Sequence, residues 1–184
     1  MIIIPSEELT LTEKARLRAQ ARDAGIARAK KKLALGPNEI TFRAGQNIQD
    51  FGTVGREQWL TQNLAAVNTQ YSLWTTLAAP AVGLVPQLPN NRVAVFWGAA
   101  IGTVPNPVTL LAFRKGPTAG TSMAVFDLEW LEPFLVTMGY FDEPVWYDPQ
   151  EFMSVVVTAK IATGAQAQVI LYCDIAEPVG GTIS

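Results

Sequence analysis

Histidine is absent from the 184 residues of this chain, and only one cysteine is present. Without imidazole there is no Ser–His or Cys–His nucleophile pair, no histidine-based zinc site and no usual general base. The sequence also lacks the motifs of serine–lysine enzymes, aspartic proteases and phosphate-binding loops. We therefore predict that the protein is not an enzyme and that it uses no metal, cofactor or small-molecule substrate.

Charge is scarce as well, because charged residues make up 16 % of the chain against roughly 25 % in ordinary soluble domains. Apolar residues reach 49 %. Either a large core lies under a Ser/Thr/Gln-rich surface, or neighbouring subunits bury the faces of this one, and we favour the second interpretation. The longest apolar run, 93–104, is too short to span a membrane, and the start MIIIPSEE is unlike a signal peptide.

Strict alternation of apolar residues marks two runs between residues 150 and 178. One face of the first run carries Met153, Val155, Val157, Ala159 and Ile161. One face of the second carries Ala167, Val169, Leu171, Cys173 and Ile175. A period of two indicates strands with one face on a core, so we predict that Val155, Val157, Val169, Leu171 and Cys173 are core residues. The intervening Thr163–Gly164 makes either a hairpin or a corner between two sheets.

Eight segments with strand character follow Pro37, separated by turns rich in Pro, Gly and Asn. They are roughly 39–43, 68–78, 92–101, 108–114, 122–130, 134–141, 152–161 and 166–176. This spacing predicts an all-β sandwich or barrel. Residues 48–64 could form either a helical turn or an irregular segment. Asp127 and Glu129 are predicted to lie on the solvent-exposed face of a strand. Several strands are apolar on both faces, which leaves Phe96 and Phe113 for self-association.

A basic segment precedes these strands. Thr10 and Glu13 form a capping-box pattern, helix formers fill 13–33, and Gly36–Pro37 would end the helix. Residues 13–33 have eight basic residues against two acidic ones, a net charge of +6, whereas from Pro37 to the end six basic and twelve acidic residues give a net charge of −6. Leu17 and Ile26 fall on opposite sides and Gly25 weakens the middle, so we expect two helical pieces, or one soft helix, that needs a partner.

The cations of this segment exceed what a solvated helix face needs. They are Lys14, Arg16, Arg18, Arg22, Arg28, Lys30, Lys31 and Lys32. No aromatic residue interrupts them, so we expect salt-sensitive, sequence-independent contact with nucleic acid or an anionic lipid surface. The alternative is a clamp over the acidic face of a neighbouring subunit.

One acidic cluster follows the sixth predicted strand. It comprises Asp142, Glu143, Asp148 and Glu151, interleaved with Trp146 and Tyr147. Oxygen ligands on a loop could hold calcium, and the aromatic rings could stack on a sugar. An ordinary exposed loop explains the same residues, and we favour that interpretation.

With a basic arm followed by eight predicted strands, the chain resembles the viral capsid proteins that have a single jelly roll. More narrowly, it resembles the small major capsid proteins of tailless icosahedral phages with an internal membrane. The resemblance covers residues 39–178 for the body and 9–35 for the arm. It implies two facing four-stranded sheets with strands that cross between them. The expected division is a basic helical arm at 1–36 and an eight-stranded jelly-roll sandwich at 37–184.

The resemblance also implies a function. The chain would be a structural subunit of a capsid or capsid-like shell, made in the host cytoplasm and located in the virion. Its partners would be copies of itself and other capsid subunits. The alternative is a receptor- or carbohydrate-binding head of a phage fibre, with the stretch from Asp142 to Glu151 as its site.

Overall fold

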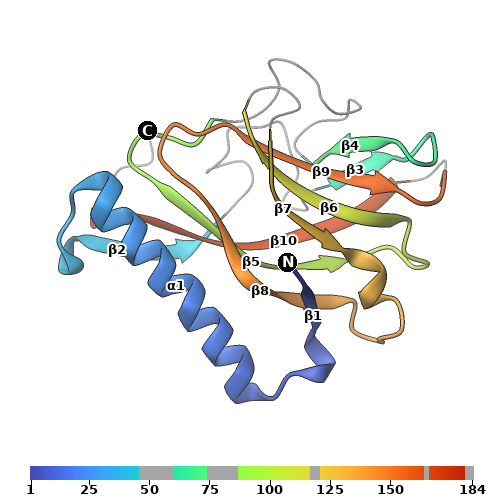
Figure 1. Cartoon of the computed structure of the whole chain (residues 1–184), viewed down its shortest axis with the longest axis horizontal. Helices are drawn as coiled ribbons and strands as arrows, with labels where there is room; N and C mark the ends of the chain where they lie inside the picture. Colours follow the sequence, from blue (N-terminus) through green and yellow to red (C-terminus); the bar gives the residue numbers. More distant parts are fainter. Residues whose placement is uncertain (46–59, 74–86, 117–120, 164–165, 181–184) are drawn as a thin grey trace.

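The structure, a computed structural model, describes residues 1–45, 60–73, 87–116, 121–163 and 166–180. Within these ranges, ten strands form two antiparallel sheets that face each other, and one long helix lies on the outside (Figure 1). The prediction of an all-β sandwich is confirmed. The number of strands differs from the eight predicted, because the sequence patterns did not reveal two short strands.

Six strands form the first sheet, in the order β1-β8-β5-β10-β2, with β3 paired to the other end of β10. Their bounds are β1 Ile3–Pro5, β2 Ile40–Ala44, β3 Leu60–Asn63, β5 Val93–Ile101, β8 Met138–Tyr147 and β10 Gln166–Pro178. The second sheet has the order β4-β9-β6-β7. Its strands are β4 Gln70–Ser72, β6 Val108–Lys115, β7 Ser122–Asp127 and β9 Met153–Ala159.

The two alternating runs are β9 and β10, and they lie in opposite sheets. The corner alternative for Thr163 is therefore correct and the hairpin is wrong. All five predicted core residues are buried between the sheets: Val155, Val157, Val169, Leu171 and Cys173. Period-two alternation indicated the correct facing of both strands, because the predicted face is apolar throughout, whereas the opposite face mixes polar residues with Val156, Ile170 and Tyr172.

Between the sheets lies what we call the inner cluster, which is built on aromatic and aliphatic side chains. Its phenylalanine rings are in contact: Phe96 and Phe113 have centroids 5.2 Å apart, and Phe126 stacks on Phe141 at 3.9 Å. The prediction that Phe96 and Phe113 face outward for self-association is wrong, since both are fully buried. Both faces of these strands are apolar, so alternation alone could not decide which one faces the core.

Helix α1, Leu11–Leu33, is continuous. Thr10 and Glu13 form the predicted capping box, in which the Glu13 carboxylate accepts from the Thr10 backbone N–H at 2.8 Å. The helix ends at Ala34, which has the left-handed φ of 55°. Gly36, the predicted cap, instead precedes the short 3₁₀ turn η2, Pro37–Glu39.

Several predicted strand bounds are corrected by local side-chain chemistry. β7 stops at Asp127 because its carboxylate accepts from the Glu129 N–H at 2.9 Å and caps the 3₁₀ helix η3, Leu128–Leu131. Glu129 therefore lies in η3 and is not on a strand. The predicted strand 134–141 begins later, as β8 at Met138, and extends through the acidic stretch. Residues 46–59 and 74–86, parts of two further predictions, lie outside the described residues.

Before α1, residues 3–5 form β1, which pairs with β8 in the register Ile3 to Phe141. The short 3₁₀ helix η1, Ser6–Glu8, then joins β1 to the helix. The N-terminal segment thus adds an edge strand to the first sheet before it covers that sheet. The division at residues 36 and 37 remains a prediction, but the two parts share the packing described next.

Candidate interaction surface

A stripe of mostly small residues holds α1 against the outer face of the first sheet. Its buried positions are Leu17, Ala21, Gly25 and Ala29, four apart and therefore on one side of the helix. Beneath them lies the outer face of β5, β8 and β10 (Figure 1). A Cβ on Gly25 would lie 2.9 Å from Cε1 of Phe42 and 3.2 Å from Cγ2 of Val95. Gly25 is therefore the point of closest approach, and it lies within an unbroken helix.

Together these groups form a second hydrophobic cluster, which we call the outer cluster. Its buried members are Leu17, Ala21, Ala29, Val93, Val95, Trp97, Tyr140 and Ala176. The apolar outer face of the first sheet, which we expected neighbouring subunits to cover, is covered by the chain's own helix. This burial is what orders a helix whose apolar face is too narrow for it to be stable alone.

Three of the eight predicted cations lie over aromatic rings of the sheet. Arg18 lies 5.0 Å from the centre of the Trp97 ring. Arg22 lies over Phe42 at 5.3 Å, and Arg28 over Trp146 at 4.7 Å. Such contacts contribute about 0.5–1 kcal/mol each at exposed sites, and the long side chains also cover apolar surface. These arginines are therefore part of the packing of α1 on the sheet.

Lys32 and Arg28 connect the basic segment with the acidic stretch. Lys32 Nζ lies 3.1 Å, and Arg28 Nη1 3.8 Å, from Oδ2 of Asp148. Only 9 % of the Asp148 side chain is exposed, so this ion pair is less screened than one at the surface. The two predicted sites are thus brought together at the C-terminal end of α1.

Four predicted cations remain on the helix without an ion pair to any described residue. Arg16, Lys30 and Lys31 are exposed, and Lys14 is half-buried. On the same helix, the hydrogen bonds from Thr10, with a minor contribution from the Arg16 charge, lower the pKa of Glu13. These four, half of the predicted set, are the cations with no ion-pair or cation–π partner among the described residues, whereas Arg18, Arg22 and Lys32 are exposed but have such partners.

The acidic stretch is mostly strand, and its side chains diverge. Trp146 lies on the outer face under Arg28, whereas Tyr147 is fully buried between the sheets. The Tyr147 hydroxyl donates to the Arg114 carbonyl at 2.9 Å, and burial raises the pKa of this phenol well above its ordinary value. Because the two rings point to opposite faces, they cannot stack on one sugar.

The acids of this stretch have partners within the chain. Asp142 accepts from the Ile2 N–H at 2.9 Å and from the Glu143 N–H at 3.0 Å. Glu151 accepts from the Asp148 N–H at 2.8 Å and from Lys115 Nζ at 2.6 Å. No group of three or more potential ligands is arranged to hold a metal ion in the described part of the chain. The Asp142 carboxylate therefore connects the N-terminus to β8, and the Glu151 carboxylate organises the turn after β8.

Large apolar side chains are exposed at one end of the sandwich, which we call the apolar end. At this end β5 and β9 terminate and β6 and β8 begin. The exposed side chains are Val104, Trp130, Leu135, Val136 and Ile161, and Leu135 is 98 % exposed. Backbone contacts bring these loops together, since the Lys160 N–H donates to the Pro107 carbonyl at 2.8 Å and the Ile101 N–H to the Thr137 carbonyl at 2.9 Å. The apolar end is at the right of Figure 1. No periodic pattern predicts it, because it is made of loops and the short helix η3.

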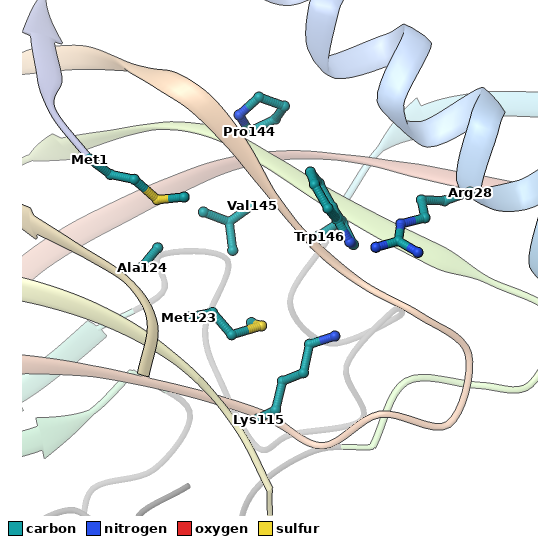
Figure 2. A pocket seen from close by; sticks show the side chains of 8 residues that line it. All are labelled: Met1, Arg28, Lys115, Met123, Ala124, Pro144, Val145 and Trp146. Atoms are coloured by element: carbon teal, nitrogen blue, oxygen red, sulfur yellow. The ribbon is translucent and has the colours of Figure 1, made fainter. Parts of the chain in front are cut away.

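A pocket of about 340 Å³ opens between β7 and the second half of β8. Met1, Met123, Val145 and Trp146 contribute to its apolar lining. Arg28 and Lys115 lie on the side of the pocket where Trp146 lies, with Met1 on the opposite side (Figure 2). We did not predict this pocket, because its residues come from five separate segments.

No protein-family model matches the chain, and no curated protein matches its sequence. None of the helices in the described ranges is long and apolar enough to span a membrane.

Proposed function

We propose that the protein is a structural subunit of a virus capsid or capsid-like shell and that its sandwich is a single jelly roll. The observation that carries this proposal is the nesting of strand pairs. When the short strands β1 and β3 are set aside, the remaining eight strands pair first with last, second with seventh, third with sixth and fourth with fifth. These pairs are β2–β10, β4–β9, β5–β8 and β6–β7.

Such nesting arises when a long two-stranded ribbon folds over itself, with its pairs distributed alternately between two sheets. Here the first and third pairs join through β5 and β10, and the second and fourth join through β6 and β9. The jelly roll is a fold of viral capsid proteins, lectins and cupins. The absence of histidine argues against the metal-dependent cupins, and the diverging side chains of Trp146 and Tyr147 argue against a sugar site there.

The exposed side chains of the apolar end favour the shell over the fibre head, because they offer a surface for self-association. Trp130 is 64 % exposed and Leu135 98 % exposed in adjoining loops, and aromatic side chains are enriched in protein interfaces. Because the outer face of the first sheet is already covered by α1, this end replaces Phe96 and Phe113 as the contact that we propose.

The cations of α1 that have no described partner would then face a polyanion, either genome or anionic lipid head groups. Lys14, Arg16, Lys30 and Lys31 offer charge without aromatic side chains, which suits contact with phosphate independent of sequence. Deleting residues 1–35 is a poor test of this role, because it would also uncover Val95 and Trp97. Point variants on the exposed side of the helix are the sharper test.

Light scattering coupled to size-exclusion chromatography, with electron microscopy of the fractions, tests the assembly. We expect the full chain to form oligomers or closed particles and Leu135→Glu to shift it toward monomers, since a charge in an apolar contact must be desolvated. The control is Leu11→Glu, which changes an equally apolar residue, 84 % exposed, at the start of α1. A full chain that stays monomeric at high concentration in physiological salt contradicts the proposal.

A further inference from the structure

The pocket between β7 and β8 combines apolar walls with cations that are only partly neutralised. Its volume of about 340 Å³ falls in the range of small-ligand sites, which are mostly apolar with a few placed polar groups. Met1 and Met123 line it, and their unbranched thioethers adapt to ligands of different shape. These walls suit a flexible aliphatic chain better than a rigid polar ring.

Arg28 supplies the polar end of the pocket. Its guanidinium carries five N–H donors, yet it makes no hydrogen bond to any residue in the described ranges. Its nearest carboxylate oxygen, Oδ2 of Asp148, is 3.8 Å away and lies closer to Lys32, at 3.1 Å. Stacking over Trp146 at 4.7 Å holds the guanidinium at the pocket wall. Its donors are therefore positioned and available for an anion.

Lys115 is the second cation of the lining, and its ammonium pairs with the Glu151 carboxylate at 2.6 Å. An ammonium has three donors, so this ion pair leaves capacity for a further acceptor. Asp148 and Glu151 each neutralise part of the positive charge beside the pocket. The remaining field suits a single negative charge, since a ligand with several charges would be repelled by these two carboxylates.

We propose that this pocket binds an amphipathic monoanion, a single carboxylate or similar head group on an aliphatic chain of medium length. The head group lies between Arg28 and Lys115, and the chain lies along Met123, Val145 and Met1. This inference goes beyond shell formation and does not depend on it. The pocket lies at the start of β7, whereas the apolar end lies where β7 ends, so the two sites are at opposite ends of this strand.

Isothermal titration calorimetry of the full chain with octanoate, kept below its micelle concentration, tests the proposal. We expect saturable binding of one octanoate per chain and binding of octan-1-ol at least about tenfold weaker, because a hydrogen bond to a charged group is worth about 1.5–3 kcal/mol. Arg28→Gln should weaken octanoate binding by about tenfold as well. Its control, Lys31→Gln, removes an exposed cation of the same helix and should leave binding unchanged.

A second pair of variants tests the apolar walls. Met123→Trp fills the pocket and should abolish octanoate binding, whereas Ser122→Trp places the same ring on the exposed neighbouring position of β7 and should not. Thermal unfolding of each variant verifies that it is folded. No saturable binding by the parent, or equal binding of octanoate and octan-1-ol, overturns the proposal. Leu135→Glu should retain octanoate binding, so failure of shell assembly and failure of this site are distinguishable.

Discussion

The inner and outer clusters bury the two faces of the same sheet by different chemistry. On β5, Ala94 and Phe96 face the second sheet, while Val93, Val95 and Trp97 face α1. The inner cluster is closed by strand against strand, with phenylalanine rings in contact. The outer cluster is closed by a helix whose buried positions are small and whose arginines lie over the rings.

This difference shows how a basic helix can act as a cover. Small residues at every fourth position let the backbone of α1 approach the sheet closely, and the long side chains beside them extend over Trp97, Phe42 and Trp146. Their aliphatic stems bury apolar surface while their charged ends stay near water. A high positive charge is thus compatible with a helix that belongs to the fold.

A charge introduced into the inner cluster should have the largest effect on stability. Val157→Asp should lower the free energy of unfolding by about 3–5 kcal/mol, because it buries an unpaired carboxylate. Thr158→Asp, at the adjacent partly exposed position of β9, should cost much less. Chemical denaturation measures both. If Val157→Asp unfolds at the parent's denaturant concentration, the inward facing of this position is incorrect.

The closest approach in the outer cluster offers the next test. Gly25→Leu should cost about 2–3 kcal/mol, since the added side chain would overlap Phe42 and Val95 and force α1 away from the sheet. Ala27→Leu adds a bulky side chain of the same kind on the exposed side of the helix and should be near neutral. Denaturation curves together with tryptophan fluorescence measure the displacement. Equal stability of the two variants would show that α1 does not pack through Gly25.

The inner cluster could be predicted from the sequence because a strand has a period of two and its apolar positions alternate. The inward facing of Val155 and Cys173 was predicted correctly for that reason. On β5 and β6 both faces are apolar, so alternation carried no information about Phe96 and Phe113. The position of α1 accounts for the apolar outer face of β5, and the packing of the two sheets buries both rings. The short strand β1 was missed because three residues are too few to show a period.

The candidate surface was harder to predict. The spacing of Leu17, Ala21, Gly25 and Ala29 is a signal for close helix packing, but alanine and glycine are too weakly apolar to make one side of a helix stand out from the other. Long-range pairs such as Lys32 with Asp148 depend on the fold and have no local signature. The acidic stretch looked like a loop because it contains Pro144 and Pro149, although its part up to Tyr147 forms the end of β8.

Two charge-matched triple variants separate the packed arginines from the exposed cations of α1. Arg18→Gln, Arg22→Gln and Arg28→Gln together should cost about 1.5–3 kcal/mol of stability, because three cation–π contacts are lost. Arg16→Gln, Lys30→Gln and Lys31→Gln remove the same charge from the exposed side and should leave stability nearly unchanged. Chemical denaturation of both variants measures the difference.

Binding to DNA and to anionic vesicles at low salt provides the second measurement for these variants. If α1 contacts a polyanion, the exposed triple variant should lose most binding and show a smaller salt dependence, because fewer counterions are released. Equal loss of DNA and vesicle binding in the two triple variants would mean that only net charge matters. The proposed division of the helix into two sides would then be incorrect.

The smallest effect expected concerns Asp174, which lies half-buried on β10 below α1. Burial raises the pKa of this carboxyl above its ordinary value of 3.8, although the charges of Arg18 and Arg22 act in the opposite direction. Because the folded state holds this proton more tightly than the unfolded chain, its ionisation opposes folding. The penalty is absent below pH 3.8, grows as pH rises from there through the raised pKa, and is complete above it.

Asp174→Asn should therefore become progressively more stable relative to the parent as pH rises through this window, and the gain should level off toward neutral pH. Denaturation of both proteins at a series of pH values from about 3 to about 7 measures it. Asp127→Ala, a control at the end of β7, removes the side chain that caps η3 and should lower stability at neutral pH instead. If Asp174→Asn loses stability as pH rises, attraction to Arg18 and Arg22 outweighs burial, and the arginines of the outer cluster act as ion-pair partners as well as a cover for the rings.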